Sequence, residues 1–355
     1  MTTNNNCFTK KDTYITKGCA ILLLLFHHLF YDDLLVNNES YIIYLFPRIT
    51  KLLCKYGYIC IFIFATLTGY GLYKKKEMSL RELIIKNETK LLSTFVLNYL
   101  LCSIIYIVVN NNGLLSYINI YGDYNAICKI AQIAIDMLGF SEIFHTKTIN
   151  ASWWYMSGAH LIIIILPILI KINEKLKTQN IFFVLLLIYC GSHFHDSSPL
   201  CCCILAAYIG YLLGESNYFY RISNSFQSKT ICILLNFLMP VMCVFLMEKL
   251  SGYFLFACFG GVSFMTITYL LLNKQGIISF VLEKLGKVSN VMYMSHVFII
   301  SLVITISRAI YSLKYAILIY AISCIIIYFF SLFSVYINKK IQFDKIINRV
   351  INKIL

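Results

Sequence analysis

The feature that most constrains the fold is a series of apolar runs, each close to the length that crosses a bilayer. A transmembrane helix needs about 20 predominantly apolar residues. Because a segment in lipid must satisfy its own backbone hydrogen bonds, such runs predict helices. We therefore expect an all-α, polytopic transmembrane helical bundle with about ten spanning helices. The ten runs lie at about 17–34, 53–73, 91–109, 153–172, 180–192, 199–214, 230–248, 253–273, 290–310 and 315–337.

The composition favours a membrane protein over a soluble one. Of the 355 residues, 59% are hydrophobic and 13% are charged, whereas soluble domains carry about 25% charged residues. No segment between the runs is long enough for a soluble domain. We expect a cytoplasmic N-terminal segment at 1–16, one transmembrane domain at 17–337 and a basic cytoplasmic tail at 338–355.

The basic residues predict the orientation of the chain in the membrane. With both termini in the cytoplasm, 22 of the 30 lysines and arginines fall in cytoplasmic segments and 8 in external ones. This asymmetry follows the positive-inside rule, and the loop at 74–90 carries its strongest signal. Since the basic residues lie in short segments between apolar runs, they indicate anionic lipid rather than nucleic acid as the partner. We expect a multi-pass protein of the inner or plasma membrane.

The 14 cysteines indicate neither a disulfide framework nor a metal site. Most lie inside apolar runs, where cysteine behaves as a small hydrophobic residue. The run Cys201-Cys202-Cys203 lacks the spacing that places several thiolates around one zinc ion. The cluster of His193, His195 and Asp196 lacks a distant third ligand, so no bound metal is expected.

A further segment, 126–140, is apolar on one side and carries polar side chains on the other. Lys129, Gln132 and Asp136 form its polar side. This pattern predicts an interfacial or re-entrant helix rather than a span.

Ionisable residues in the first apolar run are the main functional candidates, because such side chains are costly in lipid. Lys17 and His28 are eleven residues apart, which is three helical turns plus roughly 20°, so they share one face about 16 Å apart. His27 lies roughly 80° from Lys17 on the same wheel. Asp32 follows His28 by four residues, where a carboxylate could orient the imidazole. The competing interpretation is that Lys17 snorkels and the histidines lie among headgroups.

Other polar residues lie near the ends of later runs. Lys86 and Lys90 are one turn apart at the start of the third run, where they could meet a phosphate or simply anchor the helix. Trp154 and Tyr155 open the fourth run and could belong to an aromatic belt. His296 lies about two turns inside the ninth run.

Four stretches of the sequence form a series of motifs. They are Lys17-x10-His28, Phe62 to Leu72 with Thr68-Gly69-Tyr70, Trp154-Tyr-Met-Ser157 with Pro167, and Gly286-Lys-Val-Ser-Asn-Val-Met-Tyr293-Met-Ser-His296. In this order they resemble motifs of the acyltransferase-3 family of membrane enzymes that acylate cell-surface sugars. The resemblance covers residues from about 14 to 337, and its last stretch is the most specific. Lys17 stands where arginine is commoner in the family, and Ala159 stands where many members have a glutamate.

This resemblance implies an O-acetyltransferase that uses acetyl-CoA as a co-substrate, a saccharide hydroxyl as acceptor and no permanently bound cofactor. Three residues are implied as catalytic: His28 as general base near the outer face, Lys17 as a charge that stabilises the donor, and His296 on the donor's path. The remaining implied residues are Lys86, Lys90 and Lys287 for the donor, Thr68, Trp154, Tyr155, Ser157 and Tyr293 along the substrate path, and Asp32 in support of His28.

A transporter or flippase of a lipid-linked sugar is the alternative from another class. It would share the spans, the basic loops and the buried polar residues. Transporters often contain paired halves with interrupted helices, and the sequence shows no such repeat. Acyl transfer is therefore the first expectation.

Overall fold

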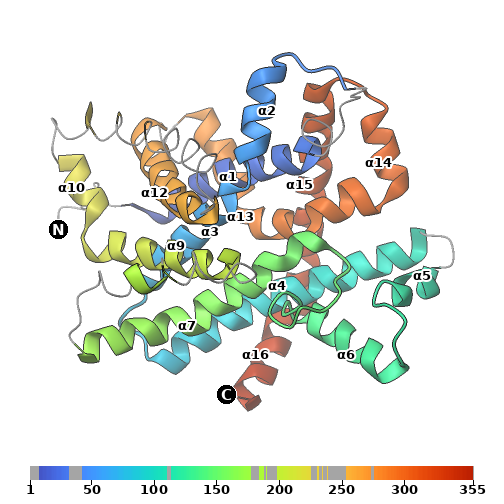
Figure 1. Ribbon diagram of the computed structural model, residues 1–355, viewed down its shortest axis with the longest axis horizontal. Coiled ribbons are helices and arrows are strands. Elements are labelled where there is room, and N and C mark those ends of the chain that lie inside the picture. Colours follow the sequence, from blue (N-terminus) through green and yellow to red (C-terminus); the bar gives the residue numbers. More distant parts are fainter. Residues whose placement is uncertain are drawn as a thin grey trace. The chain divides into compact units, whose positions relative to one another are not determined.

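The computed structural model describes residues 8–31, 42–109, 113–176, 184–187, 189, 198–224, 230, 231, 234, 238, 253–272 and 276–354. These residues are mostly helical (Figure 1), and the only β-structure among them is an isolated bridge between Ile43 and Tyr315. The expected all-α fold class is confirmed. The helices are α1 (Lys10–Tyr31), α2 (Pro47–Tyr56), α3 (Ile59–Tyr73), α4 (Leu80–Val109), α5 (Gly113–Asn119), α6 (Ala126–Met137), α7 (Trp154–Leu176), α9 (Ser198–Glu215), α10 (Tyr218–Asn224), α12 (Tyr253–Leu271), α13 (Ile277–Val297), α14 (Ile304–Tyr311), α15 (Ala316–Ile341) and α16 (Phe343–Ile354), with a 3-10 turn η2 (Ala151–Trp153) and a π-helical turn η3 (Phe298–Leu302).

Several of these helices are long and apolar enough to cross a membrane. Within the described residues, α1, α4, α15 and η2 with α7 meet this criterion alone. Three bent pairs meet it if each is one span: α2 with α3, α9 with α10, and α13 with α14 through η3. The described residues thus contain four to seven candidate spans, consistent with a multi-pass membrane protein. The predicted spans at 180–192 and 230–248 lie mostly outside the described residues.

The first helix begins earlier than the apolar run predicts. It starts at Lys10 rather than near residue 17. The backbone N–H of Thr9 donates to Asp12 Oδ2 at 2.7 Å, and the N–H of Asp12 donates to Thr9 Oγ1 at 3.2 Å. This reciprocal capping satisfies N–H groups that have no partner inside the helix. The length of an apolar run indicates only the part of a helix that crosses the membrane. The sequence therefore did not predict the polar first turns of α1.

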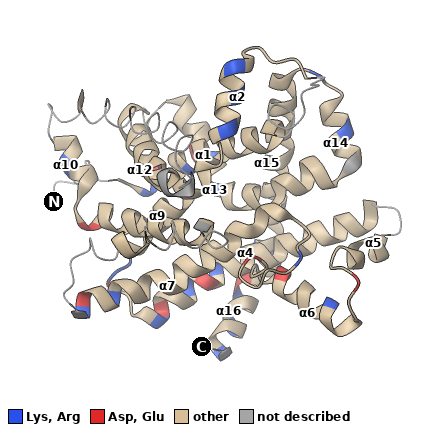
Figure 2. Ribbon diagram, in the orientation of Figure 1, with Lys and Arg blue, Asp and Glu red and all other residues tan. Residues whose placement is uncertain are grey.

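In several of the long apolar helices the charged residues lie toward the helix ends, with uncharged stretches between them (Figure 2). In α7 the charged residues are Lys171, Glu174 and Lys175, all in its last two turns. In α15 they are Lys339 and Lys340, at its C-terminal end. Such uncharged stretches are what a helix in hydrocarbon requires.

The chain divides into two compact units, each made of three segments. The first unit comprises Met1–Ile21, Tyr58–Leu83 and Gly158–Lys287. The second comprises Leu22–Gly57, Ile84–Ser157 and Val288–Leu355.

The core of the first unit is the packing of α3 against α9. A Cβ added at Gly69 of α3 would lie 1.7 Å from the carbonyl oxygen of Ala207, and one added at Gly210 of α9 would lie 2.0 Å from that of Thr66. No side chain fits at these distances, so both positions need glycine. Small residues at a helix contact allow backbones to approach closely, and this approach drives helix association in lipid.

In the second unit, tyrosine hydroxyls tie the C-terminal helices to the second half of α1. Tyr311 of α14 donates to the carbonyl oxygen of Leu29 at 3.0 Å, and Tyr320 of α15 donates to that of Leu22 at 2.9 Å. The ring of Tyr320 also packs edge-on against Phe26, with centroids 5.5 Å apart. These bonds fix the part of α1 that carries the candidate histidines.

The helix α6 occupies the segment predicted as interfacial or re-entrant, but its polar side is not where the sequence suggested. Asp136 is buried, with 1% of its surface exposed, whereas Ile127 and Ile130 are 80% and 66% exposed. Its apolar side chains face outward, as suits lipid, and its carboxylate faces protein. The polar residue Asp136 of this helix therefore faces protein rather than solvent.

We predict that Gly69→Ala lowers stability by about 1–3 kcal/mol, because the added methyl group would overlap the backbone of α9. Gly71→Ala on the same helix is the matched control, since a Cβ there meets nothing within 4 Å. Thermal unfolding of the purified protein in detergent measures both. Equal melting temperatures for the two variants would contradict the close packing of α3 and α9.

Candidate active site

In the second unit, the structure brings His28 of α1 next to His296 of α13. Their ring centroids lie 4.7 Å apart and the ring planes are inclined by 56°. His296 is fully buried, while His28 is only partly buried. A partly accessible imidazole thus lies beside a fully buried one. Both histidines were predicted as site residues from separate motifs.

The tautomer of His296 follows from its hydrogen bond. Its Nδ1 lies 2.6 Å from the carbonyl oxygen of Tyr293. A carbonyl only accepts, so Nδ1 must carry the proton, and the Nε2 of the neutral ring holds a free lone pair. Within the described residues this buried Nε2 has no hydrogen-bond partner. A buried polar atom without a partner calls for a functional explanation, and proton exchange with a neighbour is one.

His27 has a different environment from His28. Its Nδ1 lies 2.6 Å from the carbonyl oxygen of Cys54, and Cys54 Sγ donates to the carbonyl oxygen of His27 at 3.5 Å. A Cβ added at Gly57 would lie 2.6 Å from the His27 Cβ. His27 therefore holds α1 against the end of α2, which is a structural role.

Aromatic side chains surround His296 on its own helix and on α7. The ring of Tyr293 lies 5.9 Å from that of His296 and 5.7 Å from that of Tyr155. The hydroxyl of Tyr293 donates to the carbonyl oxygen of Ser152. Trp153 Nε1 donates to the carbonyl oxygen of Met294 at 2.7 Å. The Tyr293 ring thus contacts both His296 and Tyr155, and Trp153 holds α13 in place.

The sequence missed Trp153, because the motif pointed to its neighbour Trp154. Trp153 is buried and hydrogen bonded to α13, whereas Trp154 is partly exposed. Ser157 is buried, and its hydroxyl donates to the carbonyl oxygen of Gly139 at 2.8 Å. Gly139 has φ of +79°, so this serine stabilises a turn that favours glycine.

The predicted residues of the first unit include Lys17, Thr68 and Lys287. Lys17 is partly buried, next to Gly18, where an added Cβ would lie 2.1 Å from the carbonyl oxygen of Leu282 on α13. Thr68 donates to the carbonyl oxygen of Phe64 within α3 at 2.8 Å. The Lys287 ammonium lies 2.5 Å from Glu283 Oε1. Lys17 thus lies next to a close approach of α1 to α13, and Lys287 is paired.

Two other predicted donor contacts, Lys86 and Lys90, lie exposed near the start of α4 in the second unit. The structure therefore brings together His28, His296, Tyr293 and Tyr155, but does not add these lysines to that cluster. Asp32 lies outside the described residues, as do His193, His195 and Asp196. Within the described residues, no three His, Cys, Asp or Glu side chains are grouped to hold a metal ion.

A buried tyrosine chain that the sequence did not reveal supports this cluster. The Tyr99 hydroxyl lies 2.7 Å from those of Tyr117 and Tyr121, and Tyr121 donates to Asp136 Oδ2 at 2.8 Å. Each hydroxyl has one proton, so the donors run from Tyr117 through Tyr99 and Tyr121 to the carboxylate. The ring of Tyr99 packs 5.6 Å from that of Trp153. The chain thus extends from α6 to the indole that bonds α13.

The environment of Asp136 explains why the network ends there. Burial raises the pKa of its carboxyl, and the hydrogen bonds that it accepts oppose this shift. Two of these bonds are from Ser141 Oγ and the Ile149 N–H, each at 2.9 Å. Burial also raises the pKa of Tyr121, and the negative charge of the nearby Asp136 raises it further. This phenol therefore remains a hydrogen-bond donor near neutral pH. A signal was present in the sequence: a carboxylate on the polar side of a largely apolar helix.

Comparison with protein-family models, curated proteins and solved structures gave no match. The resemblance noted in the sequence is therefore carried by its motifs alone.

We predict that Tyr121→Phe lowers stability by about 1–3 kcal/mol, because a buried carboxylate and a second hydroxyl lose their partner. Tyr124→Phe is the control, since that side chain is 55% exposed on the same segment. Thermal or chemical unfolding of both purified variants provides the comparison. A Tyr121→Phe protein as stable as the Tyr124→Phe protein would contradict the network.

Proposed function

We propose that the protein is an integral membrane acyltransferase that moves an acetyl group from acetyl-CoA to a hydroxyl of a cell-surface or lipid-linked sugar. The observation that carries the proposal is the contact between His28 and His296, whose rings lie 4.7 Å apart. Both histidines belong to motifs that resemble those of the acyltransferase-3 family. His28 is partly accessible, and a neutral imidazole can accept a proton, as general base catalysis requires.

The reaction requires His28 to accept one proton and later to donate one proton. His28 accepts the proton of the acceptor hydroxyl while the oxygen attacks the thioester carbonyl carbon. The C–O bond forms, the C–S bond breaks, and the CoA thiolate leaves. The imidazolium then returns a proton to the thiolate, so that free CoA and the acetyl ester are the products. No oxidant or metal enters this balance.

His296 acts in this proposal as a positioning residue for His28. Its Nε2 lone pair can accept a hydrogen bond from the neighbouring imidazole, because its Nδ1 proton is held by the Tyr293 carbonyl oxygen. That bond would fix which nitrogen of His28 faces the hydroxyl. Lys17 would stabilise the donor by charge, and the exposed Lys86 and Lys90 are cations for its phosphates.

The proposed membrane topology completes the assignment. We infer ten spans in an inner or plasma membrane, with both termini in the cytoplasm. The distribution of lysine and arginine supports this, with 22 of 30 in the segments that the topology places in the cytoplasm. A cytosolic donor and an external acceptor would then require a polar path through the bundle.

We predict that His28→Ala reduces acetyl transfer by about 100-fold or more, because general base catalysis contributes 10²–10⁴. Purified protein with labelled acetyl-CoA, assayed for CoA release and acetylated acceptor, measures this. His27→Ala, with protein level and folding controlled, should lower stability but retain catalysis in the folded fraction. Full transfer by His28→Ala, or an essential His27 with a dispensable His28, would end the proposal.

The same assay separates the enzyme from a transporter. A flippase of a lipid-linked sugar would leave acetyl-CoA intact at every acceptor concentration. CoA release that depends on both the acceptor and His28 is expected for the enzyme alone.

A further inference from the structure

The helix α16 presents basic and apolar side chains next to each other on its exposed side. Lys345, Arg349 and Lys353 are four residues apart, so they form one row along the helix. All three are exposed, and within the part of the chain that the structure describes none of them is in an ion pair. Ile346 and Val350 are each 49% exposed. On a helical wheel Ile346 lies about 20° from Lys353, so the apolar pair borders the basic row.

The other side of α16 packs against protein within the second unit. Asn348 Oδ1 accepts a hydrogen bond from Thr89 Oγ1 of α4 at 3.1 Å, and Ile351 is only 7% exposed. On the wheel, the direction opposite to Asn348 and Ile351 is that of Lys353 and Ile346. The contact with α4 thus fixes the rotation of α16, and the border between its basic row and its apolar pair points away from the protein.

The preceding helix indicates where α16 lies relative to the bilayer. The candidate span α15 has no charged residue over 316–338, a stretch about 33 Å long at 1.5 Å per residue. This length matches the hydrocarbon core of a bilayer. The stretch is followed by Lys339 and Lys340, and α15 ends before Gln342, whose φ is +51°. Because α16 begins at the next residue, Phe343, it starts where the hydrocarbon meets the headgroups.

The contact on α4 indicates the same level. Thr89 stands two residues before the apolar run at 91–109 of this candidate span. The neighbouring Lys86 and Lys90 are exposed. Cations at the end of an apolar run lie at the membrane surface. Two spans that are far apart in sequence therefore both place α16 at that surface.

The exposed side of α16 needs a partner that is apolar and anionic at once. Exposed aliphatic side chains are unfavourable in water, and Ile346 and Val350 remain exposed although α16 packs against α4. The one acidic residue of the helix, Asp344, lies about 140° from Arg349 on the wheel, so it does not neutralise the basic row. A lipid surface offers acyl chains beside phosphates. Helices with this pattern lie in the plane of the interface and bind anionic lipid.

We propose that α16 is an interfacial helix that binds anionic phospholipid in preference to zwitterionic phospholipid. Ile346 and Val350 contact the acyl chains, and the row of Lys345, Arg349 and Lys353 binds the phosphates. This binding depends neither on acyl transfer nor on the membrane face at which α16 lies. Either proposal can therefore fail without the other.

The test is hydrogen exchange of residues 343–354 in the full-length protein, reconstituted in nanodiscs of phosphatidylcholine with or without phosphatidylglycerol of identical chains. Phosphatidylglycerol should slow this exchange by about 100-fold, because each of the three cations contributes about fivefold near an anionic surface. High salt should reduce the difference, since it screens exposed charges. Arg349→Gln combined with Lys353→Gln should reduce the slowing to about fivefold, because only Lys345 remains.

A matched pair of substitutions controls for general charge effects. Arg48→Gln combined with Lys51→Gln removes the same two residue types from exposed positions of α2 in the same unit. This variant should retain the full effect of phosphatidylglycerol. Ile346→Gln combined with Val350→Gln should speed exchange in both lipids, because the contacts with acyl chains are lost. Exchange of α4 in the same samples shows whether each variant is folded.

Three results would overturn the proposal. The first is equal exchange of the wild-type segment in the two lipids. The second is an undiminished effect of phosphatidylglycerol on the variant that lacks Arg349 and Lys353. The third is slow exchange produced by free CoA in phosphatidylcholine alone and reversed by the same substitutions, which would make the basic row a nucleotide site instead.

Discussion

The hydrogen bond from His296 Nδ1 to the Tyr293 carbonyl oxygen fixes the tautomer of His296, on which the proposed function of the second unit depends. It fixes the proton on one nitrogen and leaves the other with a lone pair in a buried position beside His28. The surrounding contacts serve to hold α13 in place: Trp153 bonds the Met294 carbonyl oxygen, and Tyr293 bonds that of Ser152. A π-helical turn follows directly after α13, and such turns are frequent at functional sites. The position of His296 thus depends on backbone acceptors rather than on a carboxylate.

Much of the fold could be predicted from hydrophobic length alone. The runs at 91–109, 153–172 and 315–337 lie within or largely within α4, α7 and α15. The start of α1 could not be predicted in this way, because Thr9 and Asp12 cap the helix with polar groups outside the apolar run. The burial of Asp136 could not be predicted either, because hydrophobic periodicity does not distinguish a carboxylate that faces water from one that accepts hydrogen bonds from protein groups.

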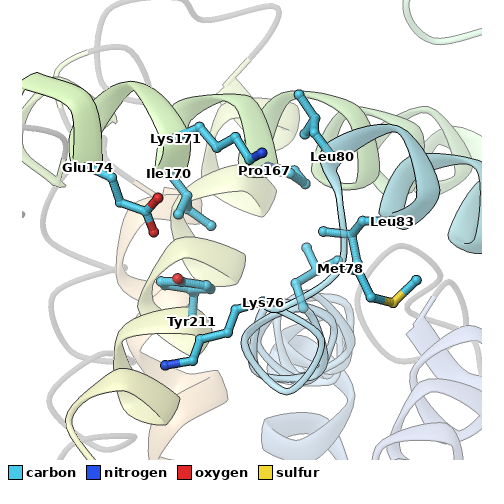
Figure 3. Close-up of a pocket in the computed structure, with 10 residues that line it drawn as sticks. Lys76, Met78, Leu80, Leu83, Pro167, Ile170, Lys171, Glu174 and Tyr211 are labelled. Atoms are coloured by element: carbon cyan, nitrogen blue, oxygen red, sulfur yellow. The ribbon is translucent and has the colours of Figure 1, made fainter.

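The candidate site was partly predictable. Spacing on one helical wheel favoured His28 over His27, and the structure gives His27 a separate bond to Cys54. The contact between His28 and His296 could not be derived, because it joins two helices far apart in sequence. The same holds for a pocket lined by Leu72 of α3, Leu83 of α4, Lys171 of α7 and Tyr211 of α9 (Figure 3). Sequence patterns indicate which residues share a helix face, whereas a functional site depends on which helix faces pack against one another.

The central claim is that His28 and His296 act as one unit, and a double-mutant cycle tests it most directly. The rate of acetyl transfer from labelled acetyl-CoA would be measured for His28→Ala, His296→Ala and the double variant, with folding checked for each. Residues that act together give strongly non-additive losses. The account predicts that the double variant is no slower than His28→Ala alone. Losses that multiply in the double variant would contradict it, because the two histidines would then contribute independently.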